Sequence, residues 1–149
     1  EKALVDNKVK ILVTGAVESN YQKSRIEAIC KRHGIECVSP LWQTDQLAEL
    51  NELASKFEVI VTQVTSEGFD ESFLGARIDS RMIAKLQKLY EKYKINRLFE
   101  GGEAESFVLD APLFKKRIAI ERSEKTWDGT EGRYLILDAK LVNKSVKDD

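Results

Sequence analysis

Apolar residues in the first forty positions form two short runs that flank a helical pattern. Residues 11–13, Ile-Leu-Val, do not alternate with polar residues, which favours a strand covered on both faces, as in a parallel sheet. Ser19, with Gln22 three residues later, is typical of the first turn of a helix. Residues 35–38 form a second apolar run. Strand, helix and strand in this order predict a βαβ unit with parallel strands.

The pattern changes after Trp42. Leucines and a phenylalanine at helical spacing predict an amphipathic helix over residues 44–57. Residues 59–61, Val-Ile-Val, predict a further buried strand, and residues 66–75 predict a loop or a short turn of helix. A longer helix is expected from residue 79 or 80 to about residue 93, with its apolar face in the core.

The last third of the chain has the pattern of strands. Residues 107–109, Phe-Val-Leu, form an apolar run. Apolar residues alternate with polar ones at 118–120 and 135–139, which predicts an antiparallel hairpin with a connection of about seven residues. The predicted fold class is therefore α/β, with a parallel βαβ unit over residues 1–42 and a smaller α+β domain over residues 43–149.

Composition narrows the class of protein. Hydrophobic residues make up 42 % of the 149 residues and charged residues 33 %, which is typical of a soluble globular protein. With 24 basic and 25 acidic residues, the net charge of −1 does not favour binding to nucleic acid or to a membrane surface. No apolar stretch approaches the ~20 residues of a membrane-spanning helix.

Few residues of the chain are suited to a transition metal. The only histidine is His33, and the two cysteines, Cys30 and Cys37, lie in a predicted helix and a predicted strand. We expect both thiols to be structural, in a reducing compartment such as the cytoplasm. No protein-bound metal site is expected, because a zinc site needs about four ligands.

An acidic loop carries the clearest candidate chemistry. Three carboxylates, Glu100, Glu103 and Glu105, surround the adjacent glycines Gly101 and Gly102. A glycine pair lets backbone amides approach a ligand closely, because no Cβ stands in the way. Carboxylates beside it can hold a cation, orient an amine or move a proton. The alternative is a solvated acidic turn before a buried strand.

A second candidate site lies where the two parallel strands end. Ligands of parallel sheets bind at the carboxyl ends of the strands, and the N-terminus of a helix attracts anions. These ends carry Gly15, Ala16, Ser19, Asn20, Tyr21 and Gln22 on one side and Leu41 and Trp42 on the other. The alternative is that these residues only cap the loop between strand and helix.

Four segments together resemble one enzyme family, diphthine–ammonia ligase of the N-type ATP pyrophosphatase group. Residues 15–27 are similar to its Gly-Ala-x-x-Ser-x-Tyr-Gln-x-x-Arg-Ile-Glu stretch, and residues 40–42 match its Pro-Leu-Trp. Residues 100–112, Glu-Gly-Gly-Glu-Ala-Glu-Ser-Phe-Val-Leu-Asp-Ala-Pro, are similar to its Glu-Gly-Gly-Glu-aromatic-Glu-Thr signature, and residues 68–75 also fit. The resemblance extends over residues 11–116.

The resemblance implies an activity and its partners. The family uses ATP with Mg²⁺ to adenylate the carboxylate of diphthine, a modified histidine of translation elongation factor 2. Ammonia then displaces AMP and gives diphthamide. The implied architecture is a nucleotide-binding domain of Rossmann-like (HUP-type) fold, of which residues 1–42 form the last βαβ part, followed by a substrate-binding domain. Elongation factor 2 and ammonia are the implied partners, and a homo-oligomer is possible.

The resemblance also implies roles for the candidate residues. The implied catalytic residues are Glu100, Glu103 and Glu105, of which Glu103 or Glu105 would position ammonium and take its proton. The implied substrate-binding residues are Gly101, Gly102, Asp70, Glu71 and Trp42. The implied nucleotide-binding residues are Gly15, Ala16, Ser19, Tyr21 and Gln22.

Several of these roles have alternatives. Asp70 and Glu71 contact the substrate or only anchor their loop, and Tyr21 contacts the nucleotide or packs on the sheet. An aromatic ring such as that of Trp42 or Phe69 could hold the trimethylammonium group of diphthine by a cation–π contact. The sequence does not select between these alternatives.

The chain departs from the family pattern in two ways. The family's phosphate-gripping motif, Ser-Gly-Gly-Lys-Asp-Ser, does not occur in these 149 residues. Within the signature, Ala104 replaces an aromatic residue and Phe99 stands where glycine is usual. We therefore expect the carboxy-terminal part of a ligase, inactive by itself. The alternatives are a non-catalytic module that binds a nucleotide or a partner, and a fragment with its strand edge at residues 11–13 exposed for pairing between chains.

Overall fold

The computed structural model describes residues 9–144, which fall into two compact units. Unit 1 lies within Glu1–Asp45 and unit 2 within Gln46–Asp149. In the part of the chain that the structure describes, no helix combines the length and the apolar character that crossing a membrane requires.

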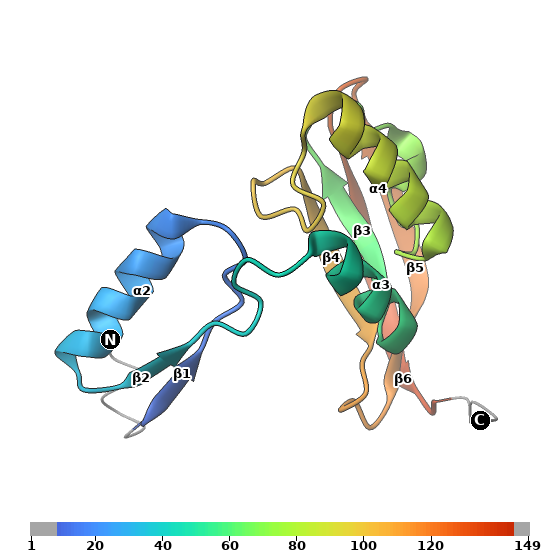
Figure 1. Cartoon of the computed structure of the whole chain (residues 1–149). Helices are drawn as coiled ribbons and strands as arrows, with labels where there is room; N and C mark the ends of the chain where they lie inside the picture. Colours follow the sequence, from blue (N-terminus) through green and yellow to red (C-terminus); the bar gives the residue numbers. More distant parts are fainter. Residues whose placement is uncertain (1–8, 145–149) are drawn as a thin grey trace. The chain divides into compact units, whose positions relative to one another are not determined.

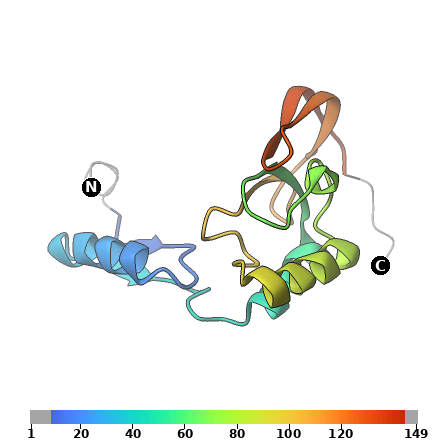
Figure 2. The same cartoon turned by 90° about the horizontal axis from the view of Figure 1, so that it is seen from above.

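Unit 1 is the predicted βαβ unit. Strand β1 (Ile11–Val13) and strand β2 (Glu36–Val38) pair in parallel, and helix α2 (Asn20–Arg32) connects them. Helix α2 lies along one side of the strand pair (Figures 1 and 2). Gly34, in the left-handed conformation at φ +63°, follows the helix and lets the chain turn back into β2.

The predicted burial of β1 on both faces is wrong for the residues described. Ile11 is 54 % exposed and Val13 is 64 % exposed. A sheet of two strands with one helix on one side leaves the opposite side of the strands uncovered. The buried apolar residues of this unit are Ala16, Val17 and Cys30, which is a small core.

Unit 2 is an antiparallel sheet covered by helices. The strand order is β4-β3-β6-β5, and all neighbouring strands are antiparallel. Helices α3 and α4 lie on one face of this sheet (Figures 1 and 2). In chain order its elements are α3 (Gln46–Lys56), β3 (Glu58–Val64), the 3₁₀ helix η1 (Glu71–Phe73), α4 (Ser80–Tyr93), β4 (Ala104–Asp110), β5 (Arg117–Trp127) and β6 (Gly132–Val142).

Strand β3 pairs with two different segments along one edge. Near its end, Gln63 pairs with Arg133 and Val64 with Gly132 of β6. Earlier, the amide of Val61 donates to the carbonyl of Ala76 at 3.0 Å, in a segment that precedes α4. This segment therefore takes the place of β6 beside the first half of β3.

The connection of the β5–β6 hairpin is shorter than predicted. It spans residues 128–131, because β5 and β6 extend to Trp127 and Gly132. The Asp128 carboxylate accepts hydrogen bonds from the amides of Thr130 and Glu131, both at 2.8 Å. This side chain closes the turn that the sequence prediction gave about seven residues.

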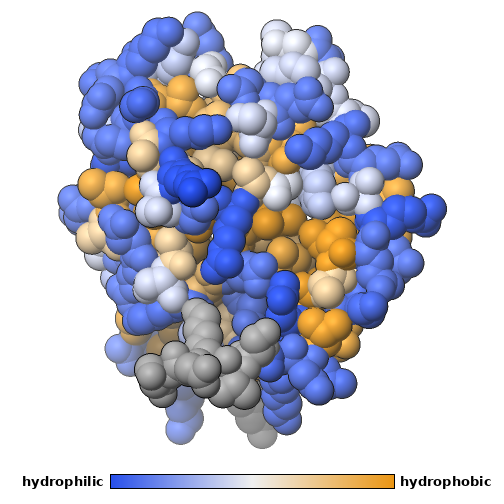
Figure 3. Space-filling view, turned by 90° about the vertical axis from the view of Figure 1, so that its right-hand side faces the viewer, coloured by the Kyte–Doolittle hydropathy of each residue, from blue (hydrophilic) through white to orange (hydrophobic). Residues whose placement is uncertain are grey.

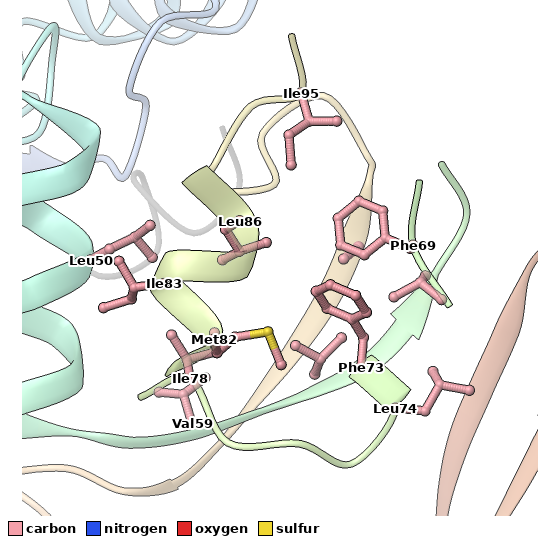
Figure 4. Close-up of a cluster of buried hydrophobic side chains, with 13 residues drawn as sticks. Leu50, Val59, Phe69, Phe73, Leu74, Ile78, Met82, Ile83, Leu86 and Ile95 are labelled. Atoms are coloured by element: carbon pink, nitrogen blue, oxygen red, sulfur yellow. The ribbon is translucent and has the colours of Figure 1, made fainter. Parts of the chain in front are cut away.

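The core of unit 2 lies between the two helices and the sheet. Figure 4 shows Leu50 of α3 and Met82, Ile83 and Leu86 of α4 pointing into a cluster with Phe69 and Phe73. Leu86 is fully buried and Leu50 is 2 % exposed. Burial of each such leucine stabilises the fold by roughly 1.5–3 kcal/mol. The helix predicted from residue 79 or 80 to about residue 93 is confirmed.

The surface of the molecule combines polar side chains with scattered apolar ones. Figure 3 shows hydrophobic side chains in several patches on a face that is otherwise mostly hydrophilic. Large apolar side chains exposed in unit 2 include those of Leu113, Leu135, Leu137 and Leu141. The alternating pattern that predicted the hairpin thus places leucines on its solvent-exposed face.

Candidate functional site

The acidic loop joins α4 to β4 and is folded by its own hydrogen bonds. Helix α4 ends at Tyr93, and the following residue, Lys94, caps it with a left-handed φ of 58°. The side-chain oxygen of Asn96 accepts from the amide of Leu98 at 2.9 Å, and the amide of Phe99 donates to the carbonyl of Asn96 at 3.0 Å. Asn96 therefore organises the turn that leads into the glycine pair.

Phe99 is held in a backbone conformation that favours glycine. Its φ is 64°, in the left-handed region, which costs a non-glycine residue roughly 1–2 kcal/mol. The ring lies edge-on to Phe69, with 6.2 Å between the ring centres. Packing against the aromatic core offsets the backbone cost, and the conformation explains why glycine suits this position.

Glu103 fixes the acidic loop at both of its ends. Its Oε1 atom accepts a hydrogen bond of 2.6 Å from the amide of Asn96, seven residues earlier. Its carbonyl accepts from the amide of Thr65, just after β3, at 3.0 Å, and the Thr65 hydroxyl donates to the carbonyl of Gly102 at 2.7 Å. The loop is thus tied to the end of β3.

The two glycines are required by the geometry of this loop. A Cβ at Gly101 would lie 2.7 Å from Oε1 of Glu103, an oxygen already fixed by the amide of Asn96. Gly102 has a φ of +82°, which other residues rarely adopt. The first glycine makes room for the carboxylate and the second makes the turn.

The second oxygen of Glu103 is the most unusual polar atom of the site. Oε2 is buried and has no hydrogen-bond partner among the residues that the structure describes. Buried acceptors are nearly always paired, because an unpaired one costs about 1–3 kcal/mol. Such an oxygen is chemically suited to accept an N–H or O–H donor from a ligand.

Glu105 has a different environment. It is exposed on β4, opposite Gln63 of β3, which is in turn opposite Arg133 of β6. Gln63 and Arg133 line a depression of about 340 Å³ together with Asp128 and Glu131 of the hairpin turn. Glu105 therefore lies on a polar row of the outer sheet face, not inside the loop.

Glu100 belongs to the loop as well. It is half-buried, and its backbone amide lies 3.5 Å from the side-chain oxygen of Asn96, which it contacts as a hydrogen-bond donor. The structure thus brings Glu100 and Glu103 into one loop organised by Asn96, whereas Glu105 lies exposed on strand β4.

Asp70 caps the 3₁₀ helix η1. Its carboxylate accepts from the amide of Ser72 at 2.7 Å, and hydrogen bonding from Ser72 holds the pKa of Asp70 below its ordinary value. Lys85 of α4 donates to the Ser72 hydroxyl at 3.1 Å. Of the two roles open for Asp70, these contacts supply the anchoring one. Glu71 is exposed in the first turn of η1.

The candidate residues of unit 1 lie around the carboxyl ends of its two strands. The hydroxyls of Thr14 and Ser39 are 2.9 Å apart and link the ends of β1 and β2. The amide of Gln43 donates to the carbonyl of Val17 at 2.8 Å, which ties the two following loops together. Gly15 is exposed, with no atom within 4 Å of an added Cβ.

The start of α2 shows the predicted cap in part. The Ser19 hydroxyl accepts from the amide of Gln22 at 3.3 Å. Tyr21 is 69 % exposed, and its hydroxyl and ring contact the guanidinium of Arg25. Packing of Tyr21 on the sheet, one of its two possible roles, is therefore excluded. Ala16, by contrast, is buried at 6 % exposure.

Only one of the two candidate aromatic rings for a quaternary ammonium group is accessible. Phe69 is 7 % exposed and packs against Phe73, with 4.9 Å between ring centres. Trp42 is half-buried in unit 1, and the Lys23 ammonium lies 4.2 Å from the centre of its ring. Trp42 is thus already in contact with one cation, and Phe69 belongs to the core.

Sequence reasoning missed the residues that hold the acidic loop in place. Thr65 lies almost forty residues before the glycines, and no local pattern connects the two. Asn96 carried a weak signal, since asparagine is common in turns that follow helices. Between residues 9 and 144 no group of three or more histidine, cysteine, aspartate or glutamate side chains is arranged to hold a metal ion.

Two sequence families match the chain, one for each end. The diphthamide synthase C-terminal domain matches residues 44–142, and the diphthamide synthase N-terminal domain matches residues 1–37. The first match alone covers more than half of the chain.

Curated relatives agree with this match. The chain is 42 % identical over 132 residues to a diphthine–ammonia ligase of Schizosaccharomyces pombe, covering 88 % of this chain and 22 % of the relative. It is 39 % and 38 % identical over 118 residues to the diphthine–ammonia ligases of Bos taurus and Homo sapiens, covering 78 % of this chain and 44 % of each relative. The chain thus spans less than half of the length of these relatives. By sequence, it belongs to the diphthamide synthase family, whose members include the diphthine–ammonia ligases.

Proposed function

We propose that this chain is the carboxy-terminal part of an ATP-dependent diphthine–ammonia ligase that acts on elongation factor 2 in the cytoplasm. The family membership supports the reaction class, and the buried, unpaired oxygen of Glu103 supports a site for a nitrogen nucleophile. Unit 1 would complete the nucleotide side of the enzyme, and unit 2 would supply the amidation loop.

The proposed reaction has two balanced steps. In the first, a carboxylate oxygen of diphthine attacks the α-phosphorus of ATP, and pyrophosphate leaves. In the second, ammonia attacks the carbonyl carbon of the acyl-adenylate, the nitrogen loses a proton to a base, the C–O bond to AMP breaks, and the amide forms. Ammonium must lose a proton before it can attack, because it has no lone pair.

Glu103 is the proposed residue for ammonium. Its Oε1 is fixed by the amide of Asn96, which leaves Oε2 as a buried acceptor of fixed position. Ammonium offers four N–H donors and a positive charge, so it both pairs the oxygen and balances the carboxylate charge. In this proposal the same oxygen takes a proton from ammonium before ammonia attacks. Glu105, exposed on β4, is the weaker candidate for this role.

For the acyl group of the substrate we propose residues of unit 2. Gly101 and Gly102 would allow the acyl group to approach Glu103, with Asp70 and Glu71 anchoring the neighbouring loop. Trp42 of unit 1 is a separate candidate for the trimethylammonium group, which would have to displace the Lys23 ammonium from the ring. Elongation factor 2 would present the modified histidine, and neither nucleic acid nor a membrane is required.

The nucleotide side is proposed for the loop after β1. Gly15 is exposed with open space beside it, and the first turn of α2 offers amides to an anion. Gly15, Ala16, Ser19, Tyr21 and Gln22 are the proposed contacts. The described residues supply no carboxylate cage for Mg²⁺, so the ion would arrive bound to the phosphates of ATP.

The reaction is tested with the gene product that contains this chain. Purified elongation factor 2 carrying diphthine is incubated with ATP and ammonium, and the modified histidine peptide is analysed by mass spectrometry. The proposal predicts conversion of the acid to the amide, with AMP and pyrophosphate as products. Absence of amide, with substrate and nucleotide both bound, would contradict it.

The alternative is a non-catalytic module that binds a nucleotide or a partner. The gene product that contains this chain is incubated with ATP, ammonium and elongation factor 2 carrying diphthine. ATP binding without AMP release favours the module, whereas AMP release that depends on the diphthine substrate favours a ligase.

A further inference from the structure

The outer edge of strand β5 has no strand partner. β5 is the last strand in the order β4-β3-β6-β5, and among residues 9–144 no other strand pairs with it besides β6. It is 11 residues long, from Arg117 to Trp127. A long unpaired edge of this kind presents a row of backbone donors and acceptors to another chain.

The charges along this edge complement themselves. The central residues read Glu121, Arg122, Ser123, Glu124 and Lys125. If two β5 strands pair antiparallel about Ser123, Arg122 faces the partner's Glu124 and Glu121 faces the partner's Lys125. Two-fold symmetry repeats each pair, so four pairs of opposite charge form.

Other registers lack this match. A shift by one residue places Glu121 opposite the partner's Glu124, or Arg122 opposite the partner's Lys125. Parallel pairing of equivalent residues places each charge opposite itself. Opposite charges directly across two strands are worth roughly 0.2–1 kcal/mol each, and like charges are destabilising by similar amounts. The charge pattern therefore selects one register and one direction.

The pairing of β5 with β6 is irregular at Glu121, at the start of the charged segment. The β5–β6 pairing has register shifts between Ile120 and Ser123. Arg117 pairs with Val142 and Trp127 with Gly132, so ten residues separate these pairs on both strands. The two shifts therefore cancel: Glu121 is the extra residue of β5 and Leu137 that of β6, while Arg122 to Trp127 pair without interruption on β5. The Arg122–Glu124 pairs of the proposed association lie in this regular part, and the Glu121–Lys125 pairs lie beside the irregularity.

One of these charges already has a partner within the chain. The Glu121 carboxylate contacts the ammonium of Lys140 on β6. A carboxylate has two oxygens with about four acceptor positions, so Glu121 can also accept the partner's Lys125. Neither Arg122 nor Glu124 has an ion pair within the described residues.

From this pattern we infer that two copies of this chain associate through antiparallel pairing of their β5 edges, in the register centred on Ser123. The occupant of the edge is thus a second copy, because this same segment read in the opposite direction supplies the complementary charge order. The exposed leucines on the outer face of the hairpin are not needed for this association.

Sedimentation equilibrium of the 149-residue chain over a range of concentrations tests the inference. The wild-type chain is expected to form a dimer whose Kd rises with added salt. Glu124→Arg creates two like-charged pairs and is expected to raise the Kd by at least about tenfold. The double variant Arg122→Glu/Glu124→Arg restores opposite charges across the edge and is expected to restore dimerisation.

Two further variants keep this test decisive. Glu67→Arg makes the same charge change in an exposed loop far along the chain from β5, and its Kd should match that of the wild type. Lys125→Glu probes the other charge pair if Glu124→Arg does not fold, as judged by circular dichroism. A monomer at every concentration, or a double variant no better than the single one, would overturn the inference.

Discussion

The two units of this chain differ in how much of their structure they can maintain alone. Unit 2 has a core of thirteen buried apolar residues from α3, β3, η1, α4 and neighbouring segments. Unit 1 buries Ala16, Val17 and Cys30, and it leaves Ile11 and Val13 largely exposed. The difference teaches that the acidic loop lies on a self-supporting scaffold, whereas the predicted nucleotide loop lies on a part of a sheet.

Separating the two units is expected to give the largest effect, because it tests directly whether each unit folds alone. A chain of residues 46–149 is expected to fold and to unfold cooperatively, because its core is complete. A chain of residues 1–45 is expected to remain largely unfolded, since domains of this size rarely bury enough apolar surface. Circular dichroism and proton–nitrogen NMR spectra of both chains measure the outcome. Loss of structure in residues 46–149 on removal of unit 1 would contradict the comparison.

Two leucines of unit 2, one buried and one exposed, give the next test. Leu86→Ala removes a fully buried side chain from the core and is expected to lower the free energy of unfolding by roughly 2–5 kcal/mol. Leu113→Ala is the matched control, because Leu113 is 95 % exposed and its replacement should cost less than about 0.5 kcal/mol. Urea unfolding gives both values. Equal costs at the two sites would show that the core is elsewhere.

Substitutions at two glycines, one in each candidate loop, then compare the two loops. Gly101→Ala places a methyl group against the Glu103 carboxylate, and we expect a loss of about 1 kcal/mol with displacement of that side chain. Gly15→Ala in unit 1 meets no atom within 4 Å and should have little effect. Thermal unfolding midpoints of the two variants, measured side by side, give the comparison. A larger loss at Gly15 would reverse the assignment of which loop is tightly built.

The smallest effect is a loss of stability in acid. Hydrogen bonding from Lys144 lowers the pKa of Asp110, and backbone hydrogen bonds from Glu131 and Thr130 lower the pKa of Asp128. A carboxylate with a lowered pKa in the folded state stabilises the fold above its unfolded pKa. That stabilisation is lost as the pH falls through the folded pKa.

Unfolding experiments at several pH values check this dependence. The free energy of unfolding of unit 2 should decline below about pH 4, where the unfolded carboxylates bind protons first. Asp128→Asn should reduce the slope of this decline, because its lowered pKa no longer contributes. A stability that rises on acidification would be the opposite of this result.

The sequence predicted the regular elements well because their patterns are local. The apolar stripe of α4, the glycine after α2 and the alternation in β5 and β6 all depend on neighbours within one element. The predicted start of α4 at residue 79 or 80 was also correct. The Asp79 carboxylate accepts from the amides of Arg81 and Met82, both at 2.9 Å. Such signals need no knowledge of tertiary structure.

The sequence could not predict what depends on distant residues. The prediction that β1 is covered on both faces was wrong, because coverage depends on other elements, which a continuous apolar run only implies. The hairpin connection was wrong because Asp128 closes it with its own side chain. Two sets of hydrogen bonds were not predicted: the bond between Glu103 and the amide of Asn96, and the bonds of Thr65 to the loop. Thr65 is remote from the loop in sequence.

The candidate site was therefore predicted as a set of residues but not as an arrangement. In the sequence alone, the carboxylates of Glu100, Glu103 and Glu105 are equivalent. The structure makes them different: Glu103 is tied down with one buried, unpaired oxygen, and Glu105 is exposed on a strand. Only tertiary structure distinguishes the two.

Glu103→Gln in the gene product that contains this chain is the most direct test of the proposed role, with Glu105→Gln as the matched control. Exchange of pyrophosphate into ATP measures adenylation, and amide formation from ammonium measures the second step. We predict that Glu103→Gln keeps the exchange but slows amidation by at least about a hundredfold, with partial recovery at higher pH where more free ammonia is present. Unchanged amidation in Glu103→Gln would contradict the account.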